Sequence, residues 1–330
     1  MASPPTAGDV RSLTRDDLGG WVDLCVDVFG GKQPRSYFES HVNDDPFLSA
    51  LSPSDILVID VDGQIASSLR LVPRQVYING GTIVHTVGLA EVATRAQYRS
   101  RGLSSRLISH ALSIVEKQTP PISVVALHTR SAAGHYRRFG WQAYPADFLA
   151  VDIRPVLPAP DVHCKALDLR RPDVCNDVLD IYSGYSSRFD GTTVRNLSYM
   201  MRWVARRHER RGDIVAAGLY DASSKMIAYA FAARPRDANG LVELDEIGLR
   251  DPHDRNALAT LLTYVVEGKS DLKVKLPYPI AIDIGVVDAD GSGRGDPGLA
   301  DAGVMYRIAD TAAFSRPLTR HHVVWPTDAY

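Results

Sequence analysis

The stretch from Thr94 to Ser104 reads Thr-Arg-Ala-Gln-Tyr-Arg-Ser-Arg-Gly-Leu-Ser and lies between a predicted strand over 88–94 and a predicted helix from about 102 to 117. The amides at the start of a helix carry partial positive charge, and Gly102 lets the backbone approach a ligand closely. Two arginines just before this glycine add further positive charge. The stretch therefore predicts a site for a phosphate or pyrophosphate group, and a basic helix start with a glycine turn is the alternative.

Hydrophobic periodicity predicts the same α/β order twice along the chain. The first half is predicted to hold helices over 14–28 and 36–42, strands over 56–61 and 64–72, a hairpin over 76–87 that turns at 79–81, a strand over 88–94, the helix over 102–117 and a buried strand over 122–127. The second half is predicted to hold a helical region over 172–211, strands over 213–220, 226–233 and 241–249, a helix over 253–266 and a strand over 280–286. We expect an α/β fold of mixed sheets (α+β), in two copies of one topology.

Length and composition agree with two domains. The chain has 330 residues and a formal charge of −2 from 37 Lys and Arg against 39 Asp and Glu, which disfavours a general nucleic-acid binder. The proline-rich passage 154–160 is the predicted linker, so we expect a disordered N-terminus over 1–10, a first domain over 11–153 and a second over 161–330. The basic run 202–211 is expected to be a solvated helix face that is salt-bridged to acidic residues of the strand over 241–249.

The sequence lacks several features, and their absence restricts the expected cellular location and the expected metal chemistry. The three cysteines form no C-x-x-C pair, which indicates a reducing compartment and no zinc module. No run of about 18 apolar residues and no signal sequence is present, so we expect a cytoplasmic protein without a membrane partner. The run 288–299 partly matches a calcium loop, but Leu299 stands where a bidentate Glu is needed, and no metal is expected.

Two short motifs stand in order in the first half of the chain. The first is Arg-Ser-Arg-Gly-Leu-Ser over 99–104, and the second is Tyr-Arg-Arg-Phe-Gly-Trp over 136–141. Together they resemble the GNAT superfamily of acyl-CoA-dependent N-acyltransferases. The first motif is similar to its signature [Q/R]-x-x-G-x-[G/A], with Ser104 where Gly or Ala is usual, and the second to its Tyr-x-x-Phe-Gly-aromatic segment. The resemblance implies that the co-substrate is acetyl-CoA.

Further segments resemble the enhanced-intracellular-survival type of acetyltransferases, which place two GNAT-fold domains in tandem. They are 88–92, 98–103, 126–128 and 136–140 in the first half, with 305–310 and 312–314 in the second. Those proteins carry a third, sterol-carrier-like domain, for which we expect no room in this chain.

The resemblance also implies a set of site residues. Tyr136 is expected to be the general acid that protonates the CoA thiolate, and a packed aromatic side chain is the alternative. The residues expected to contact CoA are Val92, Ala93, Thr94, Arg99, Ser100, Arg101, Gly102, Leu103, Ser104 and Ser131. The residues expected to line the acceptor pocket are Trp21, Asp27, Phe29 and Phe38, although core packing and a solvated helix face are the alternatives.

The general base stays open. Glu91 lies three residues after Gly88, the position at which many such enzymes carry a catalytic Glu, and strand alternation predicts that its side chain points to the opposite face. The other candidates are His128, His135, a water relay and the carboxylate of Tyr330.

The corresponding loop of the second half, Arg250 to Leu258, has no glycine, and its Asp251 and Asp254 would repel a pyrophosphate. We therefore predict a degenerate second domain that serves as a scaffold, a lid or an oligomer surface.

The function predicted by this resemblance is transfer of an acetyl group to a primary amine by direct attack in a ternary complex. The amine would be a small cationic metabolite, an aminoglycoside-like compound or a lysine. An N-acyltransferase that uses a longer acyl-CoA and a non-catalytic CoA-binding regulator or scaffold are the alternatives, and a homo-oligomer stays open.

Overall fold

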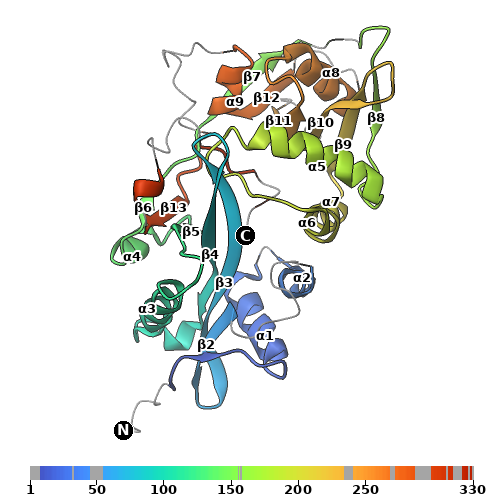
Figure 1. The fold of residues 1–330 in the computed structure, drawn as a ribbon. Coiled ribbons are helices and arrows are strands. Elements are labelled where there is room, and N and C mark those ends of the chain that lie inside the picture. Colours follow the sequence, from blue (N-terminus) through green and yellow to red (C-terminus); the bar gives the residue numbers. More distant parts are fainter. Residues whose placement is uncertain are drawn as a thin grey trace.

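The computed structural model consists of two mixed β-sheets with helices packed on them (Figure 1). The residues that it describes are 8–31, 33–44, 55–154, 156, 158–233, 241–267, 272–286, 299–309, 311–314, 322–325 and 328. Tyr330 and most of the run 288–299 lie outside these residues. In the described ranges, no helix is long and apolar enough to cross a membrane.

The first sheet has the strand order β1-β2-β3-β4-β5-β13-β6. Its strands are β1 (Arg11–Ser12), β2 (Ile56–Val61), β3 (Gln64–Ile78), β4 (Thr82–Thr94), β5 (Val124–His128), β13 (Val304–Ile308) and β6 (Gln142–Ala143). The helices packed on it are α1 (Leu18–Phe29), α2 (Arg35–Asn43), the 3-10 turn η2 (Ala96–Tyr98), α3 (Leu103–Val115) and α4 (Ala133–Arg137). One apolar cluster joins α1 and α2 to the sheet and a second joins α3 and α4 to it, so the helices cover opposite faces.

Two long strands, β3 and β4, stand where the sequence predicts several shorter strands. The predicted breaks after Val72 and before Gly88 are wrong, because β3 runs through Pro73 to Ile78. A proline is tolerated there since β2 pairs with β3 only as far as Arg70, which leaves that side of the strand without a β2 partner.

The second sheet has the order β7-β12-β11-β10-β9-β8. Its strands are β7 (Phe148–Ile153), β12 (Leu272–Pro277), β11 (Leu241–Leu249), β10 (Met226–Ala233), β9 (Ile214–Tyr220) and β8 (His163–Ala166). The remaining helices are α5 (Pro172–Ser186), α6 (Leu197–Tyr199), the π-helical turn η3 (Met200–Val204), α7 (Ala205–Arg211), α8 (Arg255–Val265), α9 (Tyr278–Asp283) and the 3-10 turn η4 (Thr311–Ala313).

One predicted strand of the second half is a helix. Residues 278–283 form α9, with proline in its first turn, and the strand that follows α8 is β12. Continuous apolar residues over a short run cannot by themselves distinguish a strand from a buried helix, which explains the error.

The two sheets repeat one topology, as predicted. In the first, β4 and β5 are parallel and α3 crosses between them; in the second, β11 and β12 are parallel and α8 crosses between them. An antiparallel strand then follows on the far side of β5 and of β12.

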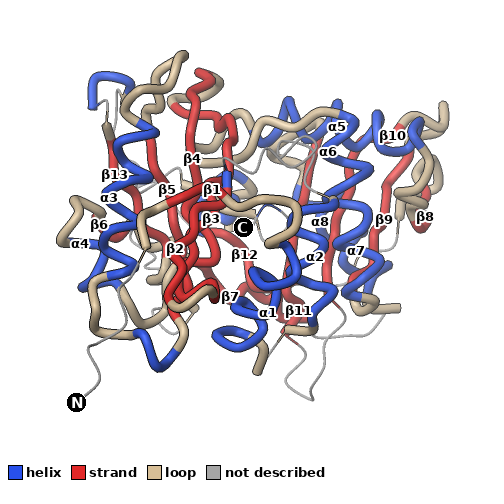
Figure 2. The backbone as a smooth tube through the Cα atoms, turned by 90° about the horizontal axis from the view of Figure 1, so that it is seen from below, coloured by secondary structure: helices blue, strands red, loops and turns tan. Residues whose placement is uncertain are grey.

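This last strand is exchanged between the halves of the chain. β13 comes from the C-terminal half and pairs with β5, whereas β7 comes from the N-terminal half and pairs with β12. A cut between 153 and 161 therefore does not separate the two sheets, although β8 to β11 lie apart from the first sheet, on the right of Figure 2.

Further contacts join the halves. Residues 191–194 run along the distal end of β3, where the Tyr77 and Gly191 backbones and the Gln75 and Val194 backbones are hydrogen-bonded. Asp44, at the end of α2, is ion-paired with Arg206 and Arg210 of α7. These contacts fix the second sheet beside the face of the first sheet that carries α1 and α2.

Candidate active site

The first feature of the site is the point where β4 and β5 separate. They pair from Thr86 with Val124 to Leu89 with Leu127, and beyond Leu89 only β3 pairs with β4. A bulge lies at this point, because β4 advances by three residues from Ala90 to Ala93 while the paired segment of β3 advances by only two residues. The strands therefore open into a V whose vertex is at Leu89.

Backbone groups of β4 line one side of this opening. Arg95 donates its N–H to the carbonyl of Ala66 on β3 at 2.9 Å. Peptide groups alternate in direction along a strand, so those of Thr94 and Val92 point toward the β5 side, where the ladder has ended. These groups fit the amides of an extended pantetheine chain. Ala93 is buried, and its carbonyl accepts a hydrogen bond from Ser67 Oγ at 2.7 Å.

The predicted phosphate loop follows the open end of β4. Gly102 takes the left-handed conformation, with φ of 75°, directly before α3, and within the described chain no side chain caps that helix end. Residues 99–102 of the loop are exposed, whereas Leu103 is buried in the core and Ser104 is half-buried. Uncapped amides at a helix start bind anions, so the loop fits a pyrophosphate.

The two arginines of the loop are exposed at its surface. Arg99 Nε donates to the carbonyl of Thr94 at 3.2 Å, and the Arg101 guanidinium lies 5.4 Å from the centre of the Tyr98 ring. Ser100 also has a positive φ, 61°, which turns the backbone sharply before Gly102.

Tyr136 lies on α4, which follows β5 and packs in the same apolar cluster as α3. Its side chain is buried and packs edge-on against Trp141 with ring centres 6.1 Å apart. Burial raises the pKa of the Tyr136 phenol to about 12, so this group keeps its proton at neutral pH. The neighbouring His135 lies within 3.4 Å of Ser104 Oγ, and Ser131 is exposed in the loop that leads from β5 to α4.

Glu91 lies on the face that was not expected. The bulge shifts the alternation of side chains along β4. The Glu91 carboxylate therefore contacts His41 of α2 and Arg70 of β3, on the α1–α2 face of the sheet. Leu89 and Val92 pack on the other face with α3. The prediction from simple alternation was wrong because it assumed a regular strand.

The environment of Glu91 makes it a weak base. Burial alone raises the pKa of this carboxyl, but the Arg70 guanidinium and the hydrogen bonds from Arg70 and His41 outweigh it and hold the pKa well below its usual range. A carboxylate so strongly stabilised as an anion binds a proton poorly at neutral pH.

The four predicted acceptor residues lie around α1 and α2. Trp21 and Phe38 are buried in the apolar cluster between these helices and the sheet, and Asp27 is ion-paired with Arg95. Phe29 is partly exposed, with its ring centre 6.3 Å from that of Phe38. None of the four lines the large cavity described next, and their role stays a prediction.

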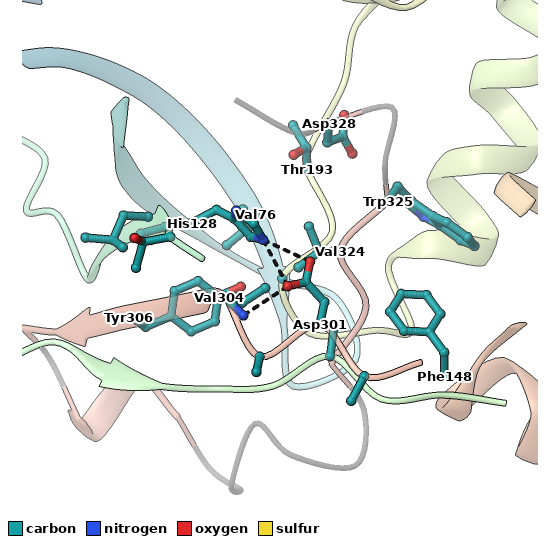
Figure 3. A pocket seen from close by; sticks show the side chains of 18 of the residues that line it. Val76, His128, Phe148, Thr193, Asp301, Val304, Tyr306, Val324, Trp325 and Asp328 are labelled. Carbon is teal, nitrogen blue, oxygen red and sulfur yellow. Dashed lines mark hydrogen bonds and ion pairs between the residues drawn. The ribbon is translucent and has the colours of Figure 1, made fainter. Parts of the chain in front are cut away.

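A cavity of about 790 Å³ lies between the first sheet and the second half of the chain (Figure 3). It extends along β5 to its C-terminal end and reaches Ala133, one helical turn before Tyr136 on α4. Among the described residues its charged lining is balanced, with four carboxylates and four Lys or Arg side chains: Glu243, Asp245, Asp301, Asp328, Arg130, Arg207, Arg211 and Lys275.

Most of this lining could not be predicted from the sequence. Its residues come from strands of both sheets, from α4 and α7, and from the segments around 192, 301 and 324. Of the lining residues, the sequence motifs single out only His128 as a candidate. Arg211 is ion-paired with Asp245 at 2.7 Å, as expected for the basic run beside the acidic strand.

The described loop between β11 and α8, which corresponds in position to the phosphate loop, differs from it at the helix start. The N-terminus of α8 is capped by Asp254, whose carboxylate accepts from the amide of Ala257 at 2.9 Å. A carboxylate at this place occupies the amides that a phosphate would need. In the described part of the chain, no group of three or more His, Cys, Asp or Glu side chains could hold a metal ion.

Residues 9–144 match the sequence profile that is described as an acetyltransferase (GNAT) domain. This match covers both motifs of the site. Comparison with curated proteins gave no match.

Solved structures share the fold over nearly the whole chain. A probable N-acyltransferase from Enterococcus faecalis is 17% identical, with a TM-score of 0.68 over 92% of this chain and 73% of its own. Eis1 from Mycobacterium abscessus is 16% identical, with a TM-score of 0.61 over 93% and 75%. A tandem GNAT protein from the clavulanic acid biosynthesis pathway is 12% identical, with a TM-score of 0.54 over 93% and 99%. These likenesses agree with two GNAT folds in tandem.

Proposed function

We propose that this protein is an acyl-CoA-dependent N-acyltransferase that moves an acetyl group from acetyl-CoA to a primary amine. The observation that carries the proposal is the V between β4 and β5, which leads from the uncapped start of α3 at Gly102 to the buried hydroxyl-bearing ring of Tyr136. The GNAT match over 9–144 supports the same co-substrate.

Two sets of backbone groups would hold acetyl-CoA, one at its pyrophosphate and one at its pantetheine chain. The amides from Ser100 to Ser104 would bind the pyrophosphate, and the peptide groups of Val92 and Thr94 would bind the pantetheine. When bound, acetyl-CoA supplies a thioester carbon that an amine can attack. Arg99 and Arg101 add positive charge near the loop's exposed edge.

Tyr136 would act as the general acid. Its phenol stays protonated at neutral pH because burial raises its pKa to about 12, and a protonated group is what a departing thiolate needs. Its place on α4, one turn after the cavity-lining Ala133, supports that role.

The cavity beside β5 is the proposed acceptor site. Its balanced charges do not select a polycation, so the acceptor panel must include amines that also carry a carboxylate, such as lysine, together with spermidine and kanamycin.

The test compares acyl donors. Acetyl-CoA, octanoyl-CoA and palmitoyl-CoA are each incubated with this panel, and release of free CoA thiol is followed. We expect the highest kcat/KM with acetyl-CoA and one of the amines. A higher value with a longer donor would support the alternative N-acyltransferase.

A further inference from the structure

A histidine and a carboxylate from the two halves of the chain meet at the vertex of the V. His128 is the last residue of β5, directly after Leu127, which forms the last pair with β4. Its Nε2 atom lies 2.9 Å from Oδ1 and 3.0 Å from Oδ2 of Asp301, although the two residues are 173 positions apart (Figure 3).

Asp301 is held in place by its own contacts. Its backbone exchanges two hydrogen bonds with Ala146, at 2.9 and 3.0 Å, and its Oδ1 accepts from the amide of Gly303 at 2.9 Å. The hydrogen bond from His128 is the main cause that lowers the pKa of the Asp301 carboxyl, which keeps it ionised.

The imidazole of His128 is also fixed from the side of Gly303. A β-carbon at Gly303 would lie only 2.6 Å from His128 Nε2, so only a glycine leaves room for the ring there. The Gly303 carbonyl accepts from the Thr129 amide at 2.9 Å, which ties this loop to the end of β5.

The ring faces the cavity. Alternate residues of β5, Val125 and Leu127, pack with α3, whereas Val124 and Ala126 pack on the cavity side with β13. His128 continues the second set, lines the cavity, and keeps 44% of its side chain exposed. Because Nε2 donates to Asp301, the tautomer leaves the Nδ1 lone pair to accept a proton.

We infer that His128, oriented by Asp301, is the general base that deprotonates the acceptor amine. The inference rests on the proposed acyltransferase function and on the cavity as its acceptor site. It also accounts for the position of β13, since the strand exchange brings the preceding Asp301 to the end of β5.

The proton balance of the step is complete. A primary ammonium gives one proton to His128 Nδ1, and the neutral nitrogen forms a bond to the thioester carbon. The C–S bond then breaks, and the sulfur receives a proton from Tyr136. The nitrogen then loses a second proton, which reprotonates the Tyr136 phenolate. The first proton passes from His128 to water in the cavity.

Other ionisable groups face the same cavity and must be considered in any pH profile. They are Arg130, Arg207, Arg211, Glu243, Asp245, Lys275, Tyr306 and Asp328. Of these carboxylates, Asp245 is ion-paired with Arg211 and Asp328 with Arg195.

The experiment measures kcat/KM against pH for the wild type, His128→Gln and Asp301→Asn, with acetyl-CoA and whichever panel amine the wild type acetylates. Gln keeps a donor near Asp301 but cannot accept the proton, so we expect a loss of about 100-fold at pH 7. The loss should shrink as the pH rises, since the amine then deprotonates without help. Asp301→Asn should lose at least about 10-fold. The control His110→Gln, on the exposed side of α3, should match the wild type.

Different outcomes overturn different claims. Activity within about 3-fold of the wild type with an unchanged pH profile in His128→Gln overturns the inference and leaves the proposed function standing. If thermal melting shows that His128→Gln does not fold, Asp301→Asn decides by the same criterion. A wild type that acetylates none of the amines overturns the proposed function and this inference with it.

Discussion

Glu91 Oε1 lies 2.7 Å from His41 Nδ1, and the same carboxylate is ion-paired with Arg70. All three side chains are almost entirely buried, and Glu91 itself has a φ of 39° at the bulge of β4. The contact therefore holds the irregular backbone from which the V opens.

Replacing Glu91 with Gln should destabilise the fold by about 3 kcal/mol, because it removes the charge that is ion-paired with the buried Arg70. Urea unfolding measures this loss. The control Glu39→Gln removes an exposed pair with Arg35 and should cost less than about 1 kcal/mol. Equal, small effects of both substitutions would contradict the role given to Glu91.

The same contact predicts how stability depends on pH. The pKa of Glu91 is lower in the folded state than its ordinary value of 4.5, so its contribution is complete above that value and is lost as the pH falls further. The free energy of unfolding of the wild type should therefore drop more steeply below pH 4.5 than that of Glu91→Gln. Parallel curves would show that Glu91 is not held as an anion.

Gly102→Glu should abolish the protection that CoA gives against thermal unfolding, because it places a carboxylate at the phosphate loop and disturbs a left-handed residue. Gly63→Glu is a matched control, since Gly63 has the same φ of 75° and equally open surroundings in the β2–β3 turn. Protection by CoA should survive in the control. Unchanged protection in Gly102→Glu would remove the phosphate site.

Tyr136→Phe should keep CoA binding and lower kcat by about 100-fold or more, as loss of a general acid does. Tyr264→Phe, at a partly exposed position of α8, serves as the control and should keep full activity. Since the pKa of Tyr136 is raised to about 12, kcat should not fall on the alkaline side up to pH ~10. Full activity of Tyr136→Phe would assign the acid to another group.

Asp254→Ala should destabilise α8 by about 1 kcal/mol through loss of its cap. It should leave the stoichiometry of CoA binding at one per chain, which isothermal titration measures. A second bound CoA in the wild type would contradict the degenerate role of the second sheet.

Local patterns explain what the sequence could predict. Gly102 belongs to a short motif whose structure depends on neighbours in the chain, so the loop and α3 could be predicted from the sequence, whereas the short helix α4 around Tyr136 was not predicted. The repeated topology followed from periodicity alone.

Long-range pairing explains what could not be predicted. The exchange of β7 and β13, the bulge at Glu91 and the meeting of His128 with Asp301 depend on strands far apart in sequence. No periodicity in either partner indicates such pairings, and for that reason the cavity and its lining were missed.

The most direct test of the central claim is to incubate the wild type and Gly102→Glu with acetyl-CoA and the amine panel, and to quantify acetylated amine by mass spectrometry together with free CoA. We expect equal amounts of acetylated amine and free CoA with the wild type and neither product with Gly102→Glu. A wild type that binds CoA but acetylates no amine would contradict the proposed function and support a non-catalytic CoA-binding protein.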